Sequence, residues 1–211
     1  MPDRLLPPDL VRLPTFVPGM RIGLFGGSFD PPHAGHLMVS LVALRAIGLD
    51  QVWWLVSPRN PLKSHAPSQD LARRVGAARA FLRHPHIHVT GVEAALGTNY
   101  TAETLACLLP SLSGAEPVWM MGADNLANFH KWRHWQAIAA MLPLAIFNRP
   151  SLALAALASP AAHALRRYRL PERAAADLPT TTAPAWVFLS KPLIPLSSTA
   201  LRAERSRQKA S

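Results

Sequence analysis

Two histidines one helical turn apart, preceded by a pair of glycines, are the residues of this 211-residue chain best suited to chemistry. His33 and His36 can direct both imidazoles into one crevice. Glycines lack side chains, so a phosphate or ribose can approach the backbone closely. A helix that begins here adds backbone N–H donors and a partial positive charge. The pattern indicates a site for a phosphate-bearing ligand. The stretch reads Gly26-Gly27-Ser28-Phe29-Asp30-Pro31-Pro32-His33-Ala34-Gly35-His36.

Other uses of this stretch fit the residues less well. A glycine pair before a helix is common in α/β proteins and is weak evidence alone. Two histidines at this spacing could bind a metal ion, but no cysteine or acidic cluster nearby completes a zinc site, so we expect no protein-held metal. The glycine spacing differs from the dinucleotide fingerprint, and no Gly-Lys-Ser/Thr of a P-loop follows.

The elements that must position this stretch alternate between short β-like runs and longer helical runs. Such alternation predicts an α/β fold, a Rossmann-like doubly wound parallel sheet with flanking helices, whose ligands bind at the carboxyl ends of the strands. Strands are predicted over residues 21–26, 51–56, 87–92, 118–121, 144–148 and 186–190. Helices are predicted over 36–47, 70–83, 101–109, 132–141 and 151–169, the last bent at Pro160, with another starting near Ser198.

The remaining composition bounds the domain organisation. We expect a disordered, Pro-rich extension over residues 1–19, a single domain over 20–211, and a surface loop over 171–184. Cys107 lies among leucines and is expected to be buried. No apolar run reaches the roughly 20 residues of a membrane span, so we expect a cytoplasmic protein. The net charge of +10 suits a polyphosphate ligand or nucleic acid, and a generally Arg-rich proteome is the alternative.

The stretch 26–36 resembles the (H/T)xGH signature of the nucleotidyltransferase superfamily, whose fold is shared with class I aminoacyl-tRNA synthetases. Its form GGSFDPPHAGH is similar in particular to the bacterial nicotinate-mononucleotide adenylyltransferase family. The resemblance implies a fold of the nucleotidyltransferase type and catalytic roles for His36 and His33. It also implies ATP binding by Gly26, Gly27, Ser28, Phe29, Asp30 and Gly35.

A second segment, Pro195-Leu196-Ser197-Ser198-Thr199-Ala200-Leu201-Arg202, resembles the ISSTxIR motif of the same family. The hydroxyls of Ser198 and Thr199 could cap a helix or donate to phosphate, and Arg202 lies one turn later. The resemblance implies that these residues hold the β- and γ-phosphates of ATP. Lys63 lies where the family carries a basic residue near the phosphates, although an ordinary surface lysine is the alternative.

A third segment starts at Gly122 and Asp124 and is similar to the family's GxDxxxxFxxW pattern. The resemblance implies that Gly122 and Asp124 bind ATP and that Trp132 stacks on a pyridine ring, for which an indole face is suited. Core packing is the alternative for Trp132 and our expectation for Trp135. The basic residues Arg133 and Arg149 are expected at the mononucleotide.

A fourth segment, Asn99-Tyr100-Thr101-Ala102-Glu103-Thr104-Leu105, is similar to the family's YTxxTL element. Thr101 can serve as an N-cap, so that the free N–H groups of the helix start favour a carboxylate over an amide by about 1 kcal/mol at best. Thr101 and Asn99 are therefore expected at the nicotinate mononucleotide, and the alternative is an ordinary capped helix.

Together these resemblances imply an enzyme that transfers AMP from ATP to nicotinate mononucleotide. The products are deamido-NAD and pyrophosphate, a step of NAD biosynthesis, with Mg²⁺ carried by the ATP phosphates. Alternative acceptors are phosphopantetheine and nicotinamide mononucleotide. A non-catalytic nucleic-acid-binding module would need aromatic residues interleaved with a basic face, which the sequence does not show, so neither nucleic acid nor a membrane is expected as a partner. A homo-oligomer stays open.

Overall fold

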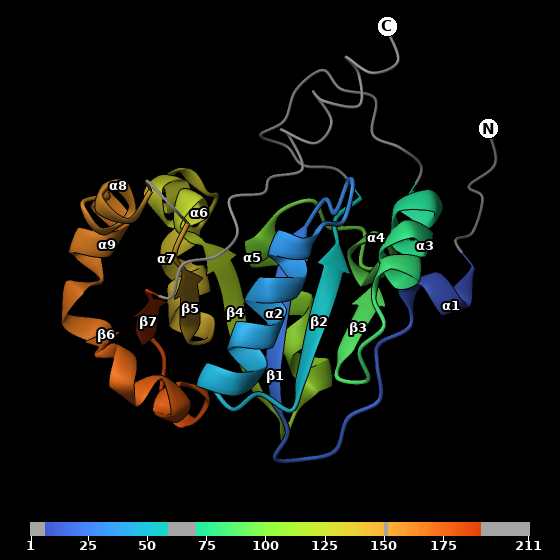
Figure 1. Ribbon diagram of the computed structural model, residues 1–211, viewed down its shortest axis with the longest axis horizontal. Helices are drawn as coiled ribbons and strands as arrows, with labels where there is room; N and C mark the ends of the chain where they lie inside the picture. Colours follow the sequence, from blue (N-terminus) through green and yellow to red (C-terminus); the bar gives the residue numbers. More distant parts are fainter. Residues whose placement is uncertain (1–6, 59–70, 150–151, 191–211) are drawn as a thin grey trace, which may run out of the picture.

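The computed structural model describes residues 7–58, 71–149 and 152–190, and in these a seven-stranded parallel sheet forms the centre of the molecule (Figure 1). The strand order is β3-β2-β1-β4-β5-β7-β6, and every neighbouring pair is parallel. The strands are β1 (Arg21–Gly27), β2 (Gln51–Val56), β3 (Ile87–Thr90), β4 (Glu116–Gly122), β5 (Leu144–Phe147), β6 (Arg169–Leu170) and β7 (Trp186–Leu189). The predicted doubly wound α/β fold is confirmed.

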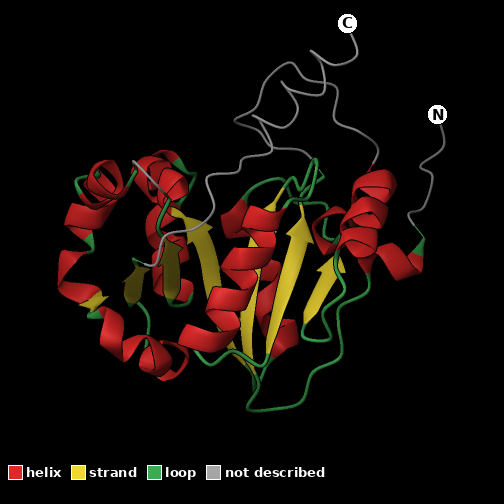
Figure 2. Cartoon of the chain, viewed as in Figure 1, coloured by secondary structure: helices red, strands yellow, loops and turns green. Residues whose placement is uncertain are grey.

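Helices cover both faces of this sheet (Figure 2). The α-helices are α1 (Pro8–Val11), α2 (Ala34–Ala46), α3 (Leu71–Phe81), α4 (Val92–Ala95), α5 (Thr101–Leu108), α6 (Ala123–Asn128), α7 (Trp135–Met141), α8 (Ala153–Leu157) and α9 (Pro160–Ala164). The 3₁₀ helices are η1 (Leu109–Leu112), η2 (Phe129–Lys131), η3 (Arg166–Tyr168) and η4 (Glu172–Thr180). Helices α2, α3 and η4 bury side chains on one face, and α5 to α9 bury theirs on the other.

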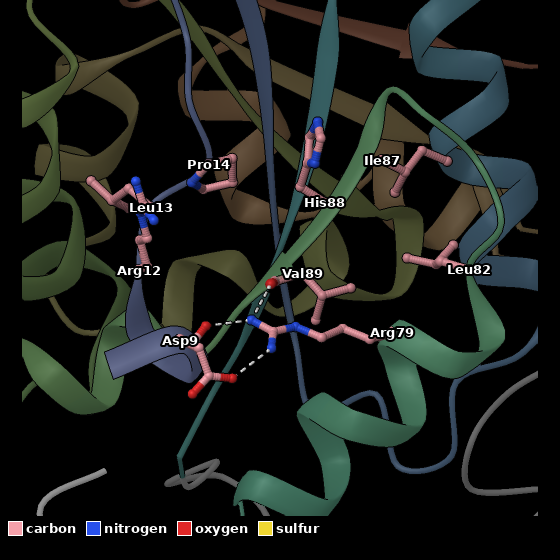
Figure 3. A pocket seen from close by; sticks show the side chains of 9 residues that line it. All are labelled: Asp9, Arg12, Leu13, Pro14, Arg79, Leu82, Ile87, His88 and Val89. Carbon is pink, nitrogen blue, oxygen red and sulfur yellow. Dashed lines mark hydrogen bonds and ion pairs between the residues drawn. The ribbon is translucent and has the colours of Figure 1, made fainter. Parts of the chain in front are cut away.

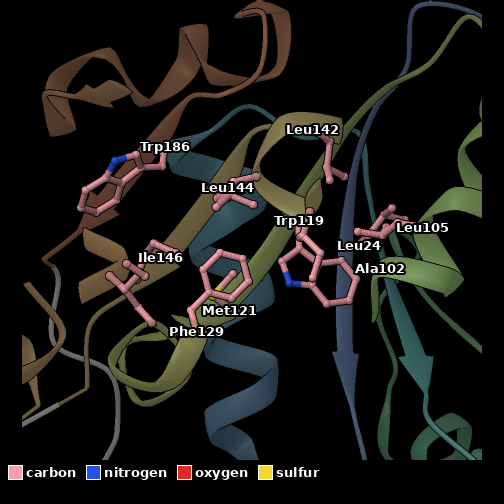
Figure 4. Close-up of a cluster of buried hydrophobic side chains, with 14 of the residues drawn as sticks. Leu24, Ala102, Leu105, Trp119, Met121, Phe129, Leu142, Leu144, Ile146 and Trp186 are labelled. Atoms are coloured by element: carbon pink, nitrogen blue, oxygen red, sulfur yellow. The ribbon is translucent and has the colours of Figure 1, made fainter. Parts of the chain in front are cut away.

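The alternation of side chains along each strand explains these two cores. In β2, for example, Trp53 packs into the cluster under α5 to α9, whereas Trp54 packs into the cluster under α2 and α3. Both indoles are fully buried, and all six β2 residues are buried, as expected for a strand covered on both faces. Figure 4 shows the α5 side of the sheet, where Trp119 of β4 lies beside Leu24 of β1 and Leu105 of α5.

The topology also defines where a ligand can bind. Strand β1 lies between β2 and β4, so the order of winding reverses on its two sides. In open α/β sheets this switch point leaves a crevice beyond the carboxyl ends of the strands. Gly27 ends β1 and Gly122 ends β4, which places two of the motifs singled out in the sequence at that edge.

A disordered extension is expected over residues 1–19, and the structure describes residues 7–19 of it. These described residues make defined tertiary contacts instead. Leu10 of α1 is buried, and its carbonyl accepts a hydrogen bond from the Gly91 N–H (2.7 Å). Asp9 pairs with Arg79 of α3 (3.3 Å), as Figure 3 shows. Further along, the Thr15 carbonyl accepts a hydrogen bond from Gln51 Nε2 at 3.1 Å. These tertiary contacts hold a Pro-rich segment that has little structural preference of its own.

Several element boundaries also differ from the prediction. The strand expected over 87–92 ends at Thr90, because Val92 already begins α4. The expected surface loop over 171–184 contains η4, whose Leu178 is buried. Cys107 is exposed rather than buried, since α5 turns Ala102, Leu105 and Leu108 toward the core instead.

Three further expectations concern the break at Pro160, the helix near Ser198 and membrane-spanning segments. The break expected at Pro160 is present, because this residue starts α9 after the Ser159 N-cap. The helix expected near Ser198 lies outside the described residues. Within the described ranges, no helix combines the length and the apolar character that crossing a membrane requires.

Candidate functional site

The loop between β1 and α2 is held against the hydrophobic core by one buried aromatic side chain. Phe29 has a positive φ of 45°, and its ring is buried against Trp54 of β2, with the ring centroids 4.5 Å apart and the planes nearly parallel. The side chain of Phe29 therefore belongs to the core, and only its backbone can line a ligand site. The neighbouring Ser28 and Asp30 are half-buried in the same loop.

The two histidines of this loop stack on each other at the start of α2. The ring centroids of His33 and His36 are 3.7 Å apart, with 25° between the planes. The backbone N–H of His33 donates a hydrogen bond to Nδ1 of His36 (3.3 Å). Because Nδ1 accepts, a neutral His36 ring carries its proton on Nε2, the nitrogen that can donate to a ligand oxygen.

His33 is buried in an unusual state. The residue is only 4% exposed, and neither ring nitrogen finds a hydrogen-bond partner in the described part of the chain. Burial, and to a smaller extent the positive charge of Arg149, lower the pKa of His33 to about 4. The ring is therefore neutral near pH 7. A buried polar group without a partner costs roughly 1–3 kcal/mol, which points to a ligand that supplies the missing bonds.

A carboxylate and a guanidinium meet at the ends of β4 and β5. Asp124, in the first turn of α6, pairs with Arg149 beyond β5, with 3.3 Å between Oδ1 and Nε. Gly122 makes this possible, because a Cβ at that position would stand 2.3 Å from Asp124 Oδ1 and 3.2 Å from Arg149 Nε. Since Arg149 also acts on the pKa of His33, residues from the ends of β1, β4 and β5 share one electrostatic environment.

A second group of predicted residues gathers at the start of α5. Arg133 pairs with Glu103 (3.1 Å) and lies over the ring of Tyr100, 4.9 Å from its centroid. The N-cap of α5 is Tyr100 and not Thr101, which is the first helical residue, so the predicted side-chain cap by Thr101 is wrong. Its backbone N–H is still one of the first-turn groups that an intrahelical bond cannot satisfy. Asn99 is exposed just before this helix.

Trp132 directly precedes Arg133 of this second group in the chain. The helix predicted over 132–141 begins only at Trp135, as α7. Trp132 lies before it, directly after η2, and has an extended backbone. Its ring is half-buried and meets Phe129 edge-on at 5.4 Å. Trp135 contacts Phe129 in a similar way at 5.7 Å, and both indoles pack against the α5-side core. Core packing, expected for Trp135, thus holds for part of the Trp132 surface as well.

The glycines of the first motif serve the core as well as a ligand. A Cβ at Gly26 would stand 2.6 Å from Cη2 of Trp119, and a Cβ at Gly27 would stand 3.1 Å from Cε2 of Phe29. Gly35 is buried in the first turn of α2. The sequence pattern predicts ligand approach alone at these positions, whereas in the structure the indole of Trp119 in β4 also lies against Gly26.

Four predicted residues cannot be placed: Lys63, Ser198, Thr199 and Arg202 lie outside the described residues. Conversely, Arg74 of α3 lies at this site although no sequence motif points to it. It is buried beside the first motif and donates hydrogen bonds to the carbonyls of Ser28 and Ser57. A usable signal existed, because Arg74 occupies the same helical stripe as Leu71, Val75 and Ala78, where a charged residue is out of place unless it has partners.

Comparison with known proteins gives a consistent result. A family model described as cytidylyltransferase-like matches residues 24–204. A Cereibacter sphaeroides protein named "Probable nicotinate-nucleotide adenylyltransferase" is 52% identical over 87% of this chain and 97% of its own length. A protein of the same name from Ruegeria pomeroyi is 50% identical over 88% of this chain and 87% of its own. Plasmodium falciparum nicotinic acid mononucleotide adenylyltransferase, solved with NaAD, shares the fold with a TM-score of 0.62 at 14% identity, over 87% of this chain and 83% of its own.

Proposed function

Because this chain belongs to the cytidylyltransferase-like family, we propose that it transfers AMP from ATP to nicotinate mononucleotide, producing deamido-NAD and pyrophosphate for NAD biosynthesis. The observation that carries the proposal is the stacked pair of His33 and His36 at the switch point, with a neutral, buried and unpartnered His33 ring among the described residues. The names of relatives about half identical over most of the chain support the choice of acceptor.

The reaction needs no nucleophilic side chain. The 5′-phosphate of the mononucleotide is already an anion, and one of its oxygens attacks the α-phosphorus of ATP. As that P–O bond forms, the bond from the α-phosphorus to the bridging oxygen breaks, and pyrophosphate leaves with the electron pair. Catalysis is then positioning plus stabilisation of the charge on the α-phosphoryl oxygens.

The two histidines divide this work. His36 donates from Nε2 to an α-phosphoryl oxygen, since its Nδ1 is occupied by the His33 backbone N–H. His33 binds a phosphate oxygen as a neutral donor, which satisfies its buried ring and adds no charge that the site must compensate. Removing one such donor from a transition state costs roughly 100- to 1,000-fold in kcat in other enzymes.

Residues at the neighbouring strand ends hold the two nucleotides. Asp124 accepts hydrogen bonds from a ribose, and Arg149 attracts the mononucleotide phosphate while it pairs with Asp124. Trp132 offers the free part of its indole face to the pyridine ring. Thr101 directs its first-turn backbone N–H toward the nicotinate carboxylate.

The residues that we propose for the β- and γ-phosphates rest on the sequence resemblance, because they lie outside the described residues. Ser198, Thr199 and Arg202 hold the β- and γ-phosphates, and Lys63 contributes a further positive charge. Mg²⁺ arrives with the ATP phosphates, because this ion keeps several waters and seldom uses an all-protein cage. The reaction takes place in the cytoplasm, where ATP is available.

Dinucleotide formation by the purified protein tests the proposal with two acceptors side by side. With ATP and Mg²⁺, nicotinate mononucleotide should react faster than nicotinamide mononucleotide, and His36→Ala should lower kcat by roughly 100-fold or more. Arg73→Ala, an exposed change on α3, serves as the matched control with wild-type rates. An His36→Ala rate within a few-fold of wild type would show that His36 is not the phosphoryl donor.

A further inference from the structure

A buried arginine stands behind the loop of the first motif. Arg74 is 4% exposed and lies on the apolar stripe of α3 between Leu71 and Ala78. Arginine is almost never buried this deeply unless its guanidinium is fully paired. The partners of Arg74 therefore indicate why the chain places a charge here.

The partners are backbone carbonyls from two loops. Nη1 of Arg74 donates to Ser28 O (3.0 Å) and to Ser57 O (2.7 Å), and Nη2 donates to Pro58 O (3.1 Å). Ser28 follows β1, and Ser57 and Pro58 follow β2. Only a guanidinium offers enough donors in one plane to reach three carbonyls on two segments at once.

These bonds fix the peptide groups of the β1 loop. Ser57 also donates its backbone N–H to Gly27 O (3.0 Å), so the two loops are joined at consecutive residues. The C=O and N–H of one peptide plane point in opposite directions. Binding Ser28 O from the side of α3 therefore turns the following N–H, that of Phe29, away from α3. Phe29 has a positive φ, so the peptide group between Ser28 and Phe29 has few alternative orientations.

The charge of Arg74 has a buried counterpart in Glu93 of α4. Glu93 is 6% exposed, and burial raises the pKa of its carboxyl to about 7, while Arg74 pulls that pKa downward. The charge of Arg74 thus acts on a buried carboxyl of a third element. Arg74 therefore joins α3 to the two loops by hydrogen bonds and acts on α4 through its charge.

We propose that Arg74 is a positioning residue for adenylyl transfer: it fixes the loop after β1 against the loop after β2, so that the ATP phosphates meet His36 in a single geometry. The inference rests on the proposed function and adds a residue that touches neither substrate. Displacing reacting groups by about 1 Å can cost roughly 100-fold in rate, so a loosened loop is enough for a large effect.

The first test compares Arg74→Lys with Arg73→Lys, an exposed neighbour on the same helix. Lysine keeps the charge opposite Glu93 but cannot span the three carbonyls. We expect Arg74→Lys to lower kcat/KM for ATP roughly 10- to 100-fold and to change KM for nicotinate mononucleotide less than about threefold. Arg73→Lys should match wild type. Equal kcat/KM values for both variants, after correction for the folded fraction, would overturn the proposal.

A double variant separates positioning from stability. Arg74→Met alone leaves the Glu93 carboxylate buried without its counter-charge and can fail to fold for that reason. Arg74→Met with Glu93→Gln removes both charges together. The proposal predicts that this protein unfolds at a higher denaturant concentration than Arg74→Met, and that its folded form stays at least roughly tenfold slower with ATP than wild type. A folded double variant with wild-type kcat/KM would refute it.

ATP binding without turnover distinguishes the two levels of inference. Calorimetric titration with ATP and Mg²⁺ in the absence of acceptor should give a weaker Kd for Arg74→Lys than for wild type, by roughly tenfold. If wild type binds ATP more tightly than Arg74→Lys but forms no dinucleotide, the proposed function is contradicted. Arg74 then remains a positioning residue for bound ATP. Equal Kd values together with equal turnover would contradict the role of Arg74 alone.

Discussion

Replacing Arg149 by methionine separates the two causes that keep His33 neutral. The pKa of His33 falls from its ordinary 6.5 to about 4 in the folded protein, so about one molecule in a thousand is protonated at neutral pH. Burial is the larger cause and the charge of Arg149 the smaller. Arg149 therefore accounts for less than half of the interval, and in Arg149→Met the pKa of His33 should rise yet stay below roughly 5.3.

A pH titration of the histidine ring resonances by NMR measures this directly. The chain has 9 histidines, and His33→Asn identifies the signal of His33 by its loss. Arg133→Met is the matched control, because Arg133 pairs with Glu103 and is no cause of the His33 shift. A wild-type pKa close to 6.5 would refute the buried, neutral state. A return to 6.5 in Arg149→Met would show that charge rather than burial is decisive.

The remaining predictions concern stability and acceptor binding. Folding raises the pKa of Glu93 from 4.5 to about 7, so the free energy of unfolding of the wild type falls as pH rises through this window. In urea unfolding, Glu93→Gln should therefore become more stable relative to wild type between about pH 5 and pH 8. Parallel pH profiles of the two proteins would contradict this. Gly122→Ala should lower the free energy of unfolding by about 1–3 kcal/mol and reduce turnover, because its Cβ meets the Asp124 carboxylate. Gly76→Ala, in open space on α3, should instead stabilise by about 0.5–1 kcal/mol, and a loss there would contradict the reasoning. Trp132→Ala should raise KM for nicotinate mononucleotide roughly tenfold with KM for ATP unchanged in steady-state kinetics, whereas equal KM values for the acceptor would place its indole in the core only.

Local features of the fold were predictable because local sequence determines them. The β-like run at residues 51–56 is β2 without a change of boundary, since the five consecutive apolar or aromatic residues after Gln51 suit a strand buried on both faces. The placement of His33 and His36 at the carboxyl end of β1 followed from the strand–glycine–helix pattern. Both depend on residues that are neighbours in the chain.

Features that depend on distant contacts were not predictable in this way. The influence of Arg149 on His33 requires β1, β4 and β5 to lie in that order, which no local pattern contains. The close approach of Trp119 to Gly26 comes from the register between β4 and β1. The ordered segment 7–19 likewise depends on contacts such as Asp9 with Arg79, seventy positions apart.

The boundary at α5 shows a subtler limit. The sequence favours Thr101 as N-cap, because a threonine hydroxyl can accept from a first-turn N–H. The helix instead begins at Thr101, one residue earlier than a Thr101 N-cap would place it. Its N-cap is Tyr100, which has an extended backbone and makes no side-chain capping bond. Packing of Ala102, Leu105 and Leu108 against the sheet determines the helix phase here, and it outweighs a cap worth about 1 kcal/mol.

Mass-spectrometric detection of dinucleotide, with pyrophosphate counted in the same reaction, tests the central claim most directly. With ATP, Mg²⁺ and nicotinate mononucleotide, the purified protein should form deamido-NAD and pyrophosphate in equal amounts, and omission of the mononucleotide should abolish both. Pyrophosphate release that does not depend on the mononucleotide, or ATP binding with no dinucleotide from either acceptor, would contradict the account.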